Sequence, residues 1–158
     1  MMAPGQSAEI VHGMDPGLQY AALPFRVADK GEVEVLLITS RETRRWVIPK
    51  GWPMKGKKPH AAAASEALQE AGVVGRIEKR AIGAYDYIKR LTNGAPLACT
   101  VDVFPLEVAR QRKRWREQAQ RVTHWFSAEE AAECVDEAGL RDLILAFAGE
   151  VRGAATRA

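Results

Sequence analysis

Apolar and polar positions alternate along the first third of the chain in a way that predicts short strands. The segments Gln19 to Val27 and Glu32 to Thr39 alternate or run apolar over the length of a strand. Pro24 interrupts the first segment, so we expect an edge position or a bulge there, because proline lacks the amide hydrogen that a sheet ladder uses. Trp46 to Ile48 predicts a third, shorter strand that ends at a proline.

The segment that follows predicts a helix with a defined start and end. Pro59 suits the first helical position, because its missing amide hydrogen would be unpaired there. Residues 60–71 are rich in alanine, the best helix former. Gly72 fits the left-handed position just past a helix end. Glu66 and Glu70 are four residues apart, so both carboxylates project from one face of this helix, about one turn apart.

A hairpin and a last strand are predicted after this helix. Lys79 to Arg90 and Leu97 to Val108 have the composition of strands. Asn93 followed by Gly94 lies between them and is the strongest short signal for a hairpin turn. Residues 110–120 predict a basic loop or helical turn, and Val122 to Phe126 predicts the last strand.

The C-terminal region predicts two helices. Ser127 precedes Glu130 by three residues, which is the pattern of a capping box at a helix start. We expect Gly139 to break this helix and Leu140 to Gly149 to form a final amphipathic helix.

Strands on both sides of a central helix, with helices at the end, indicate an α/β or α+β fold with a mixed sheet covered on both faces. A chain of 158 residues is the size of one domain. We predict this domain over residues 17–150, with a flexible leader over residues 1–16 and a frayed tail over residues 151–158.

Composition limits the class of protein. Apolar residues make up 47% of the chain, enough for a core, but no apolar run is long enough to span a bilayer. The first residues lack the charged start and apolar stretch of a secretory signal. Cys99 and Cys134 are too few for a disulfide framework. We expect both to be small buried residues in a reducing, cytoplasmic compartment.

Charge is distributed unevenly although the net charge is only +3. Arg41 to Lys58 and Arg110 to Arg121 are both strongly basic, with the acids Glu42 and Glu117 as their exceptions. Basic runs are often plain solvated surface. Two of them flanking one helix favour a polyanionic ligand.

The two glutamates and the neighbouring lysines suggest a specific chemistry. A glutamate pair at helical spacing is by itself more often a solvated face. Beside a loop that carries Lys55, Lys57 and Lys58, the pair Glu66 and Glu70 indicates a site where carboxylates hold a hard divalent cation and lysines hold phosphate.

The residues from Gly51 to Val73 resemble the Nudix box, G-x5-E-x7-R-E-U-x-E-E-x-G-U, in which U is a bulky aliphatic residue. The flanking segments ITSRETRRWVIPKG and RVTHWFSAEEAA resemble the diphosphoinositol-polyphosphate and diadenosine-polyphosphate hydrolase branch of that family. The resemblance extends roughly over residues 19–147. The matching positions are Gly51, Glu66, Glu70, Gly72 and Val73, and the departures are Lys57 and Gln69 in place of glutamates and Ser65 in place of the arginine.

This resemblance implies an αβα sandwich with a loop–helix–loop catalytic motif. It also implies a hydrolase of a phosphoanhydride bond in an X-linked diphosphate or polyphosphate, dependent on Mg²⁺ with Mn²⁺ as the alternative. By the same resemblance, Glu70 is the main metal ligand and Glu66 a ligand or water activator. Gln69 offers only a neutral carbonyl oxygen, and Ser65 cannot brace the glutamates as the family's arginine does.

Further site residues are expected outside the helix. Glu117 is the first candidate for an additional acid at the metal, because WRE resembles a tryptophan–acid element of related sequences, and Asp86 is the second. Trp46 and Trp52 fit either stacking on a base or a place in the core. The residues expected to bind substrate are Ser40, Arg41, Arg45, Lys50, Gly51, Lys55 and Lys57.

Two other functions fit parts of the pattern. The departures at Lys57, Ser65 and Gln69 fit a Nudix-fold module that binds a nucleotide or polyphosphate without catalysis. The basic runs fit a nucleic-acid binder, but only Trp115 interleaves with them, so a base-stacking platform is not indicated. We expect an anionic small molecule as partner, neither membrane nor nucleic acid, and no oligomeric state is predicted.

Overall fold

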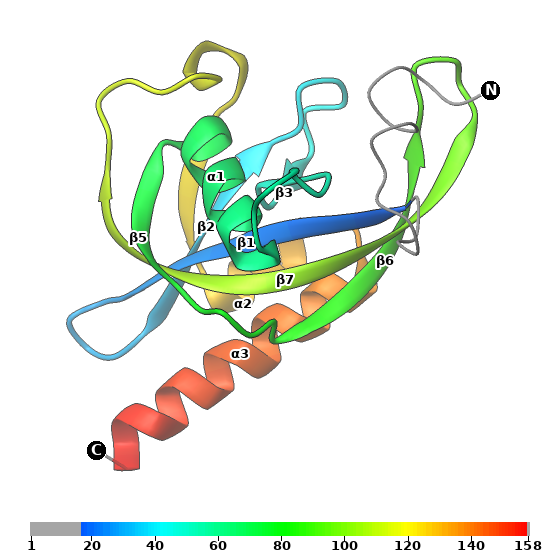
Figure 1. Ribbon diagram of the computed structural model, residues 1–158. Coiled ribbons are helices and arrows are strands. Elements are labelled where there is room, and N and C mark those ends of the chain that lie inside the picture. Colours follow the sequence, from blue (N-terminus) through cyan, green and yellow to red (C-terminus); the bar gives the residue numbers. More distant parts are fainter. Residues whose placement is uncertain (1–16, 158) are drawn as a thin grey trace.

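A mixed sheet lies at the centre of the molecule (Figure 1). The computed structural model describes residues 17–157, so the leader predicted over residues 1–16 lies outside the described residues. Within them the sheet has eight strands in the order β3-β2-β1-β7-β5, with β4 on β1, β6 on β7 and β8 on β2. The strands are β1 Leu18–Val27, β2 Val33–Thr39, β3 Trp46–Val47, β4 Lys50–Gly51, β5 Val73–Ile77, β6 Gly83–Arg90, β7 Pro96–Gln111 and β8 Thr123–Ser127.

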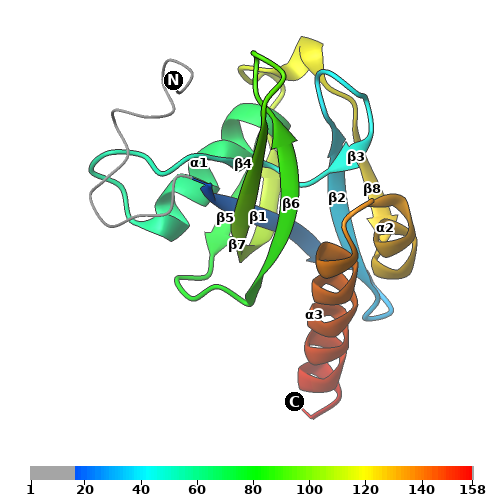
Figure 2. The same cartoon turned by 90° about the vertical axis from the view of Figure 1, so that its right-hand side faces the viewer.

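Helices cover both faces of this sheet (Figure 2). The helix α1, Pro59–Ala71, packs its alanines Ala62, Ala63 and Ala67 against one face. The helices α2, Ala128–Cys134, and α3, Ala138–Arg157, pack against the other. Their apolar stripes form two core clusters, one on each side of the sheet. The predicted αβα sandwich with a mixed sheet is confirmed.

The strand β1 lies inside the sheet, so the edge position expected from Pro24 is wrong. β1 pairs in parallel with β7 along most of its length. On its other side it pairs with β4 at residues 20 and 21 and with β2 at residues 25–27. The amide of Ala22 donates to Pro49 on that same side at 3.0 Å. Pro24, two residues on, faces the gap between β4 and β2, where its missing amide hydrogen breaks no ladder.

The ends of α1 follow from local chemistry. Pro59 occupies the start of the helix, and Gly72 follows its end with a left-handed φ of 72°. The amide of Gly72 donates to the carbonyl of Leu68 at 3.0 Å. Both predicted ends are confirmed, and the turn with Asn93 and Gly94 joins β6 to β7 as predicted.

The helices at the C-terminal end differ in part from the prediction. The capping box of Ser127 and Glu130 is present at the start of α2. The break comes at residues 135–137, and Gly139 lies inside the first turn of α3. The helix α3 continues to Arg157, past the end expected at Gly149. Val151 packs against the core and extends the helix past the predicted end. None of the described helices is long and apolar enough to cross a membrane.

Candidate active site

A pocket of about 470 Å³ opens between α1, the loop from β2 to β3, the end of β6 and the segment of residues 117–121. Carboxylates line one side and basic side chains line the other. The predicted site residues that line it are Ser40, Arg41, Arg45, Lys50, Gly51, Glu66, Glu70 and Glu117. Residues from four separate parts of the chain therefore meet in one place.

Glu66 and Glu70 project together from α1 into this pocket. Glu70 is buried, with 7% of its surface exposed, and its side chain hydrogen-bonds to that of Glu66. The amide of Lys50 donates to Glu70 Oε1 at 3.4 Å. Burial raises the pKa of Glu70 to about 8, and the adjacent Glu66 carboxylate contributes to the rise. Burial also raises the pKa of Glu66. Such a pair is costly to ionise without a nearby cation.

The carboxylate of Glu66 rests against the backbone of Gly51. A Cβ atom at residue 51 would lie 1.9 Å from Glu66 Oε2. Only glycine leaves room for the carboxylate here, which accounts for the glycine at the start of the loop–helix–loop motif.

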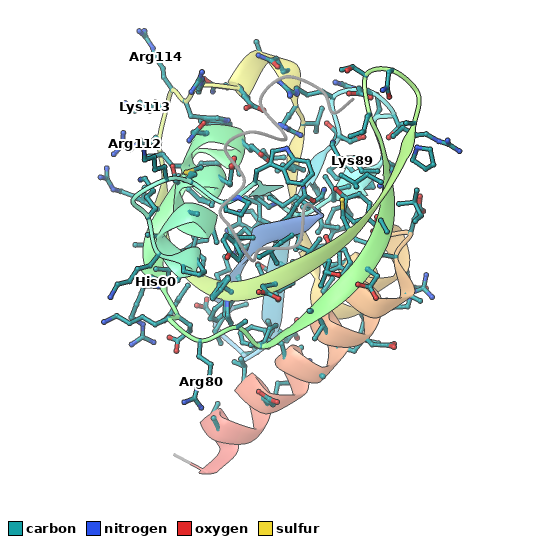
Figure 3. The ribbon with its side chains drawn as sticks, turned by 45° about the vertical axis from the view of Figure 1, so that its right-hand side comes forward. His60, Arg80, Lys89, Arg112, Lys113 and Arg114 are labelled. Carbon is teal, nitrogen blue, oxygen red and sulfur yellow. The ribbon has the colours of Figure 1, made fainter. Side chains whose placement is uncertain are left out.

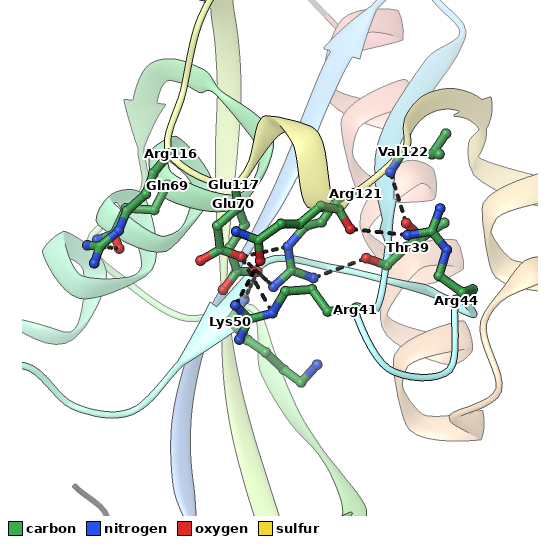
Figure 4. A network of polar contacts seen from close by, with 11 residues as sticks. Thr39, Arg41, Arg44, Lys50, Gln69, Glu70, Arg116, Glu117, Arg121 and Val122 are labelled. Atoms are coloured by element: carbon green, nitrogen blue, oxygen red, sulfur yellow. Dashed lines mark hydrogen bonds and ion pairs between the residues drawn. The ribbon is translucent and has the colours of Figure 1, made fainter.

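Glu117 and Arg121 complete the acidic side of the pocket (Figure 4). Arg121 Nε donates to Glu117 Oε1 at 2.8 Å, and Arg121 Nη2 lies 3.7 Å from Glu70 Oε1. Arg121 Nη1 also donates to the carbonyl of Thr39 at 3.0 Å, and only 9% of its side chain is exposed. Arg121 thus supplies a charge partner for the glutamates, which Ser65 cannot do. Sequence reasoning missed it, although it ends the second basic run.

Glu117 is held in place by the segment of residues 111–117, which docks onto the C-terminal end of α1. The amide of Glu117 donates to the carbonyl of Gln69 at 3.0 Å, and the amide of Arg112 donates to Gly72 at 2.8 Å. Trp115 packs on Gly72, where a Cβ atom would approach its ring to 2.3 Å. These bonds satisfy carbonyls at the helix end that lack partners within the helix. The side chains of residues 112–114 point outward into solvent (Figure 3).

Arg41 brings a basic group to the pocket next to Glu117. Arg41 lies 3.9 Å from Glu117 Oε1 and donates to Gln120 Oε1 at 3.1 Å. The loop that carries Arg41 is closed by the amide of Ser40, which donates to the carbonyl of Arg45 at 2.8 Å. These contacts hold the loop at the pocket mouth.

Lys50 also lines the pocket. Its ammonium lies 5.1 Å from the centre of the Tyr87 ring, and Tyr87 donates to Gln19 Oε1 at 2.6 Å. Burial lowers the pKa of Lys50 to about 8, while the Glu70 carboxylate opposes that change. Tyr87, Gln19, Lys89 and Arg90 line the pocket and were not predicted from the sequence.

Other predicted residues lie outside the pocket lining. Gln69 Oε1 accepts from Arg116 at 3.3 Å, and its amide nitrogen donates to Ser65 Oγ at 3.0 Å. Lys55 and Lys57 are exposed in the loop before α1. Asp86 is exposed and accepts from Thr100. The structure therefore does not bring these four residues to the carboxylates.

The two tryptophans left open by the sequence have different surroundings. Trp46 packs against the core and meets the Phe126 ring edge-on, with centroids 5.1 Å apart. Trp52 lines the pocket and belongs to neither core cluster. Only Trp52 is placed to contact a ligand.

The donor atoms on the acidic side suit a hard divalent cation. Glu66, Glu70 and Glu117 present carboxylate oxygens, the ligands that Mg²⁺ prefers. In the part of the chain that the structure describes, no three His, Cys, Asp or Glu side chains gather closely enough to enclose a metal by themselves. Mg²⁺ commonly takes one or two carboxylates and completes its shell with water and substrate phosphates. The residues present therefore fit that ion.

Comparison with known proteins places this arrangement in a family. No protein-family model matches the chain. The chain is 34% identical over 129 residues to "Nudix hydrolase 21, chloroplastic" of Arabidopsis thaliana, covering 79% of this chain and 63% of that protein. It is 33% identical over 114 residues to diphosphoinositol polyphosphate phosphohydrolase 3-alpha of Homo sapiens, covering 70% and 64%.

The chain belongs to the Nudix hydrolase family. Among solved structures, the binary complex of C. elegans Ap4A hydrolase superposes with a TM-score of 0.64 at 21% identity, covering 86% of this chain and 98% of that one. This likeness shows the Nudix fold. The chain spans somewhat less than two thirds of the length of the curated Nudix relatives named above.

Proposed function

We propose that this Nudix protein hydrolyses a phosphoanhydride bond in an X-linked diphosphate or polyphosphate, with Mg²⁺ as its cofactor. The observation that carries the proposal is that one pocket is lined both by the carboxylates of Glu66, Glu70 and Glu117 and by the basic side chains of Arg41 and Lys50. The carboxylates suit a divalent cation and the basic side chains suit phosphate.

The roles of the residues follow from their positions. Glu70, with Glu117 beside it, would hold Mg²⁺, which neutralises charge on phosphate oxygens and lowers the pKa of its bound water. Arg41 presents paired donors to phosphate oxygens, while the Lys50 ammonium acts as a point charge. Together they orient the phosphate chain between the two sides of the pocket.

Glu66 is the proposed base. Its carboxylate lies at the pocket wall against Gly51, and burial raises its pKa, which makes it a stronger proton acceptor near neutral pH. The proton of the attacking water would pass to a carboxylate oxygen of Glu66. The Arg121 guanidinium stabilises the carboxylates of Glu70 and Glu117 beside it.

The experiment is a phosphate-release screen over diadenosine polyphosphates, nucleotide sugars and inositol pyrophosphates, with and without Mg²⁺. We expect turnover that requires Mg²⁺ and falls at least roughly 100-fold in Glu70→Gln, the scale of removing one electrostatic element of a site. Glu107→Gln is the matched control, because Glu107 forms an exposed ion pair with Arg76 outside the pocket lining. Absence of turnover of every substrate at high enzyme concentration would contradict the proposal.

A second function is supported by the position of Gln69. Its side chain bonds to Arg116 and Ser65, outside the pocket lining, so it brings no oxygen to the carboxylates. With fewer ligands, the pocket suits a module that binds a nucleotide or polyphosphate without hydrolysing it. This alternative predicts binding that persists in EDTA and is unchanged in Glu70→Gln. Binding that is lost with either change excludes it.

A further inference from the structure

Glu137 lies behind the basic side of the pocket and contacts Arg45. Arg45 Nη1 is 2.7 Å from Glu137 Oε2, and the Glu137 side chain is only 8% exposed. Asp136 is also near, at 3.8 Å from Arg45 Nη1, but it is 72% exposed. Arg45 itself lines the pocket. Glu137 lies outside that lining and contacts it directly at Arg45, while its charge also acts on Lys50 in the pocket.

The start of α3 fixes the position of Glu137. The amide of Arg141 donates to the carbonyl of Glu137 at 3.0 Å, and Arg141 Nε donates to the carbonyl of Ala132 in α2 at 3.1 Å. Gly139 lies so close to β6 that a Cβ atom there would be 2.8 Å from Tyr85 Cβ. The backbone that carries Glu137 is therefore pressed against the sheet and tied to α2.

The two carboxylate oxygens of Glu137 have different surroundings. Its Oε1 atom is buried and has no hydrogen-bond partner among the residues that the structure describes. A buried, incompletely paired carboxylate is unfavourable for the fold on its own. Its Oε2 atom accepts a hydrogen bond from the Arg45 guanidinium, which lines the pocket from the β2–β3 loop. An arginine that is already fixed loses less freedom when it binds phosphate.

We propose that Glu137 is a positioning residue that fixes Arg45 for contact with the phosphate chain of the ligand. This inference rests on the proposed function of the pocket as a phosphate site. It links the start of α3, late in the chain, to the loop of residues 40–45. It also states which property of Glu137 matters: the length of its side chain, which brings an acceptor oxygen to the Arg45 guanidinium.

The experiment measures the affinity for ADP with Mg²⁺ by calorimetry, and KM and kcat for the substrate found in the screen. Glu137→Ala removes the acceptor, and Glu137→Asp keeps the charge but withdraws the carboxylate from Arg45. Both should weaken ADP binding and raise KM by about fivefold, the scale of ordering one long side chain, with kcat within about twofold. Glu137→Gln keeps an acceptor in reach and should bind ADP within about twofold of the original protein.

A double-mutant cycle separates positioning from a merely structural role. In an Arg45→Ala background, Glu137→Ala should change the Kd for ADP less than about twofold, because the residue through which it acts is gone. Asp142→Asn, an exposed acid in the same region of α3, is the control for a change of charge. If Glu137→Ala still weakens binding fivefold without Arg45, the proposal is overturned.

The outcomes also separate this inference from the proposed function. If the protein binds ADP with the predicted order of affinities among the Glu137 variants but hydrolyses no substrate, Glu137 is still a positioning residue. The proposed hydrolase activity is then refuted. A protein that hydrolyses its substrate while Glu137→Asp and Glu137→Ala keep full affinity would refute the positioning role alone. Because Glu137→Asp is a small change, it keeps the test open if Glu137→Ala does not fold.

Discussion

Arg121 bridges Glu117 and Glu70, at 2.8 Å from the first carboxylate and 3.7 Å from the second. Side chains from the segment before β8 and from α1 are thereby joined at the pocket by one buried guanidinium. The carboxylates face one another because this cation lies between them, so the acidic side of the pocket depends on a residue outside the Nudix box.

Replacing Arg121 should destabilise the protein. Arg121→Gln leaves Glu70 and Glu117 without their buried partner, and we expect the free energy of unfolding in EDTA to fall by roughly 3 kcal/mol. Urea denaturation measures it. Arg76→Gln, which breaks an exposed pair with Glu107, should change stability by less than about 1 kcal/mol. Equal losses of unfolding free energy in Arg121→Gln and Arg76→Gln would show that the buried bridge stabilises the protein no more than an exposed ion pair does.

The stability of the metal-free protein should depend on pH through Glu70. Burial raises the pKa of Glu70 from 4.5 to about 8 in the folded protein. Between these values the folded state binds more protons than the unfolded state, so stability falls as the pH rises from about 5 to 8 and then levels off for this group. Thermal unfolding in EDTA across this range measures the slope.

Two comparisons isolate Glu70 in that titration. Glu70→Gln cannot titrate and should show a flatter profile between pH 5 and 8. Added Mg²⁺ should also flatten it, because a cation favours the charged carboxylate. An identical slope in Glu70→Gln would assign the effect to other groups.

A methyl group at Gly51 should impair the site directly. Gly51→Ala places a Cβ atom 1.9 Å from Glu66 Oε2, so the carboxylate must move. A displacement of about 1 Å at a catalytic group can reduce turnover about 100-fold, and we expect a loss of that size in kcat/KM. Gly149→Ala in α3 is the control, because its Cβ atom meets nothing within 4 Å. Full activity of Gly51→Ala would mean that Glu66 is not needed where the structure places it.

Trp52 should distinguish nucleotides from other polyphosphates. It lines the pocket and belongs to neither core cluster, and an indole ring can stack on a base. Trp52→Ala should raise KM about tenfold for a dinucleoside polyphosphate, the usual scale of one stacking contact. KM for an inositol pyrophosphate should stay within about twofold, since that compound has no base. Equal effects on both substrates would assign Trp52 to structure.

Local signals in the sequence predicted the parts of the fold that depend on neighbouring residues. The ends of α1, the hairpin turn and the capping box of α2 each follow from residues a few positions apart. Pro24 misled because the gap that accommodates it is created by β2 and β4, which come later in the chain. Gly139 misled because its role is close packing against Tyr85, not the end of a helix.

The candidate site shows the same division between local and distant causes. The spacing of Glu66 and Glu70 places them on one face of α1, and the structure puts both at the pocket. Gln69, one position earlier, turns toward Arg116, whose position depends on the docking of residues 111–117. Arg121 and Lys89 reach the pocket only through the pairing of distant strands, which no local pattern records.

The attachment of residues 111–117 to the end of α1 separates two properties of that corner of the molecule. Main-chain bonds, the Gln111 side chain and the Trp115 ring hold the segment, while the side chains of Arg112, Lys113 and Arg114 point into solvent. Substitutions at these three residues can therefore change the surface charge from basic to acidic without moving Glu117. The electrostatic attraction of a ligand to this surface and the chemistry of the pocket can therefore change independently of each other.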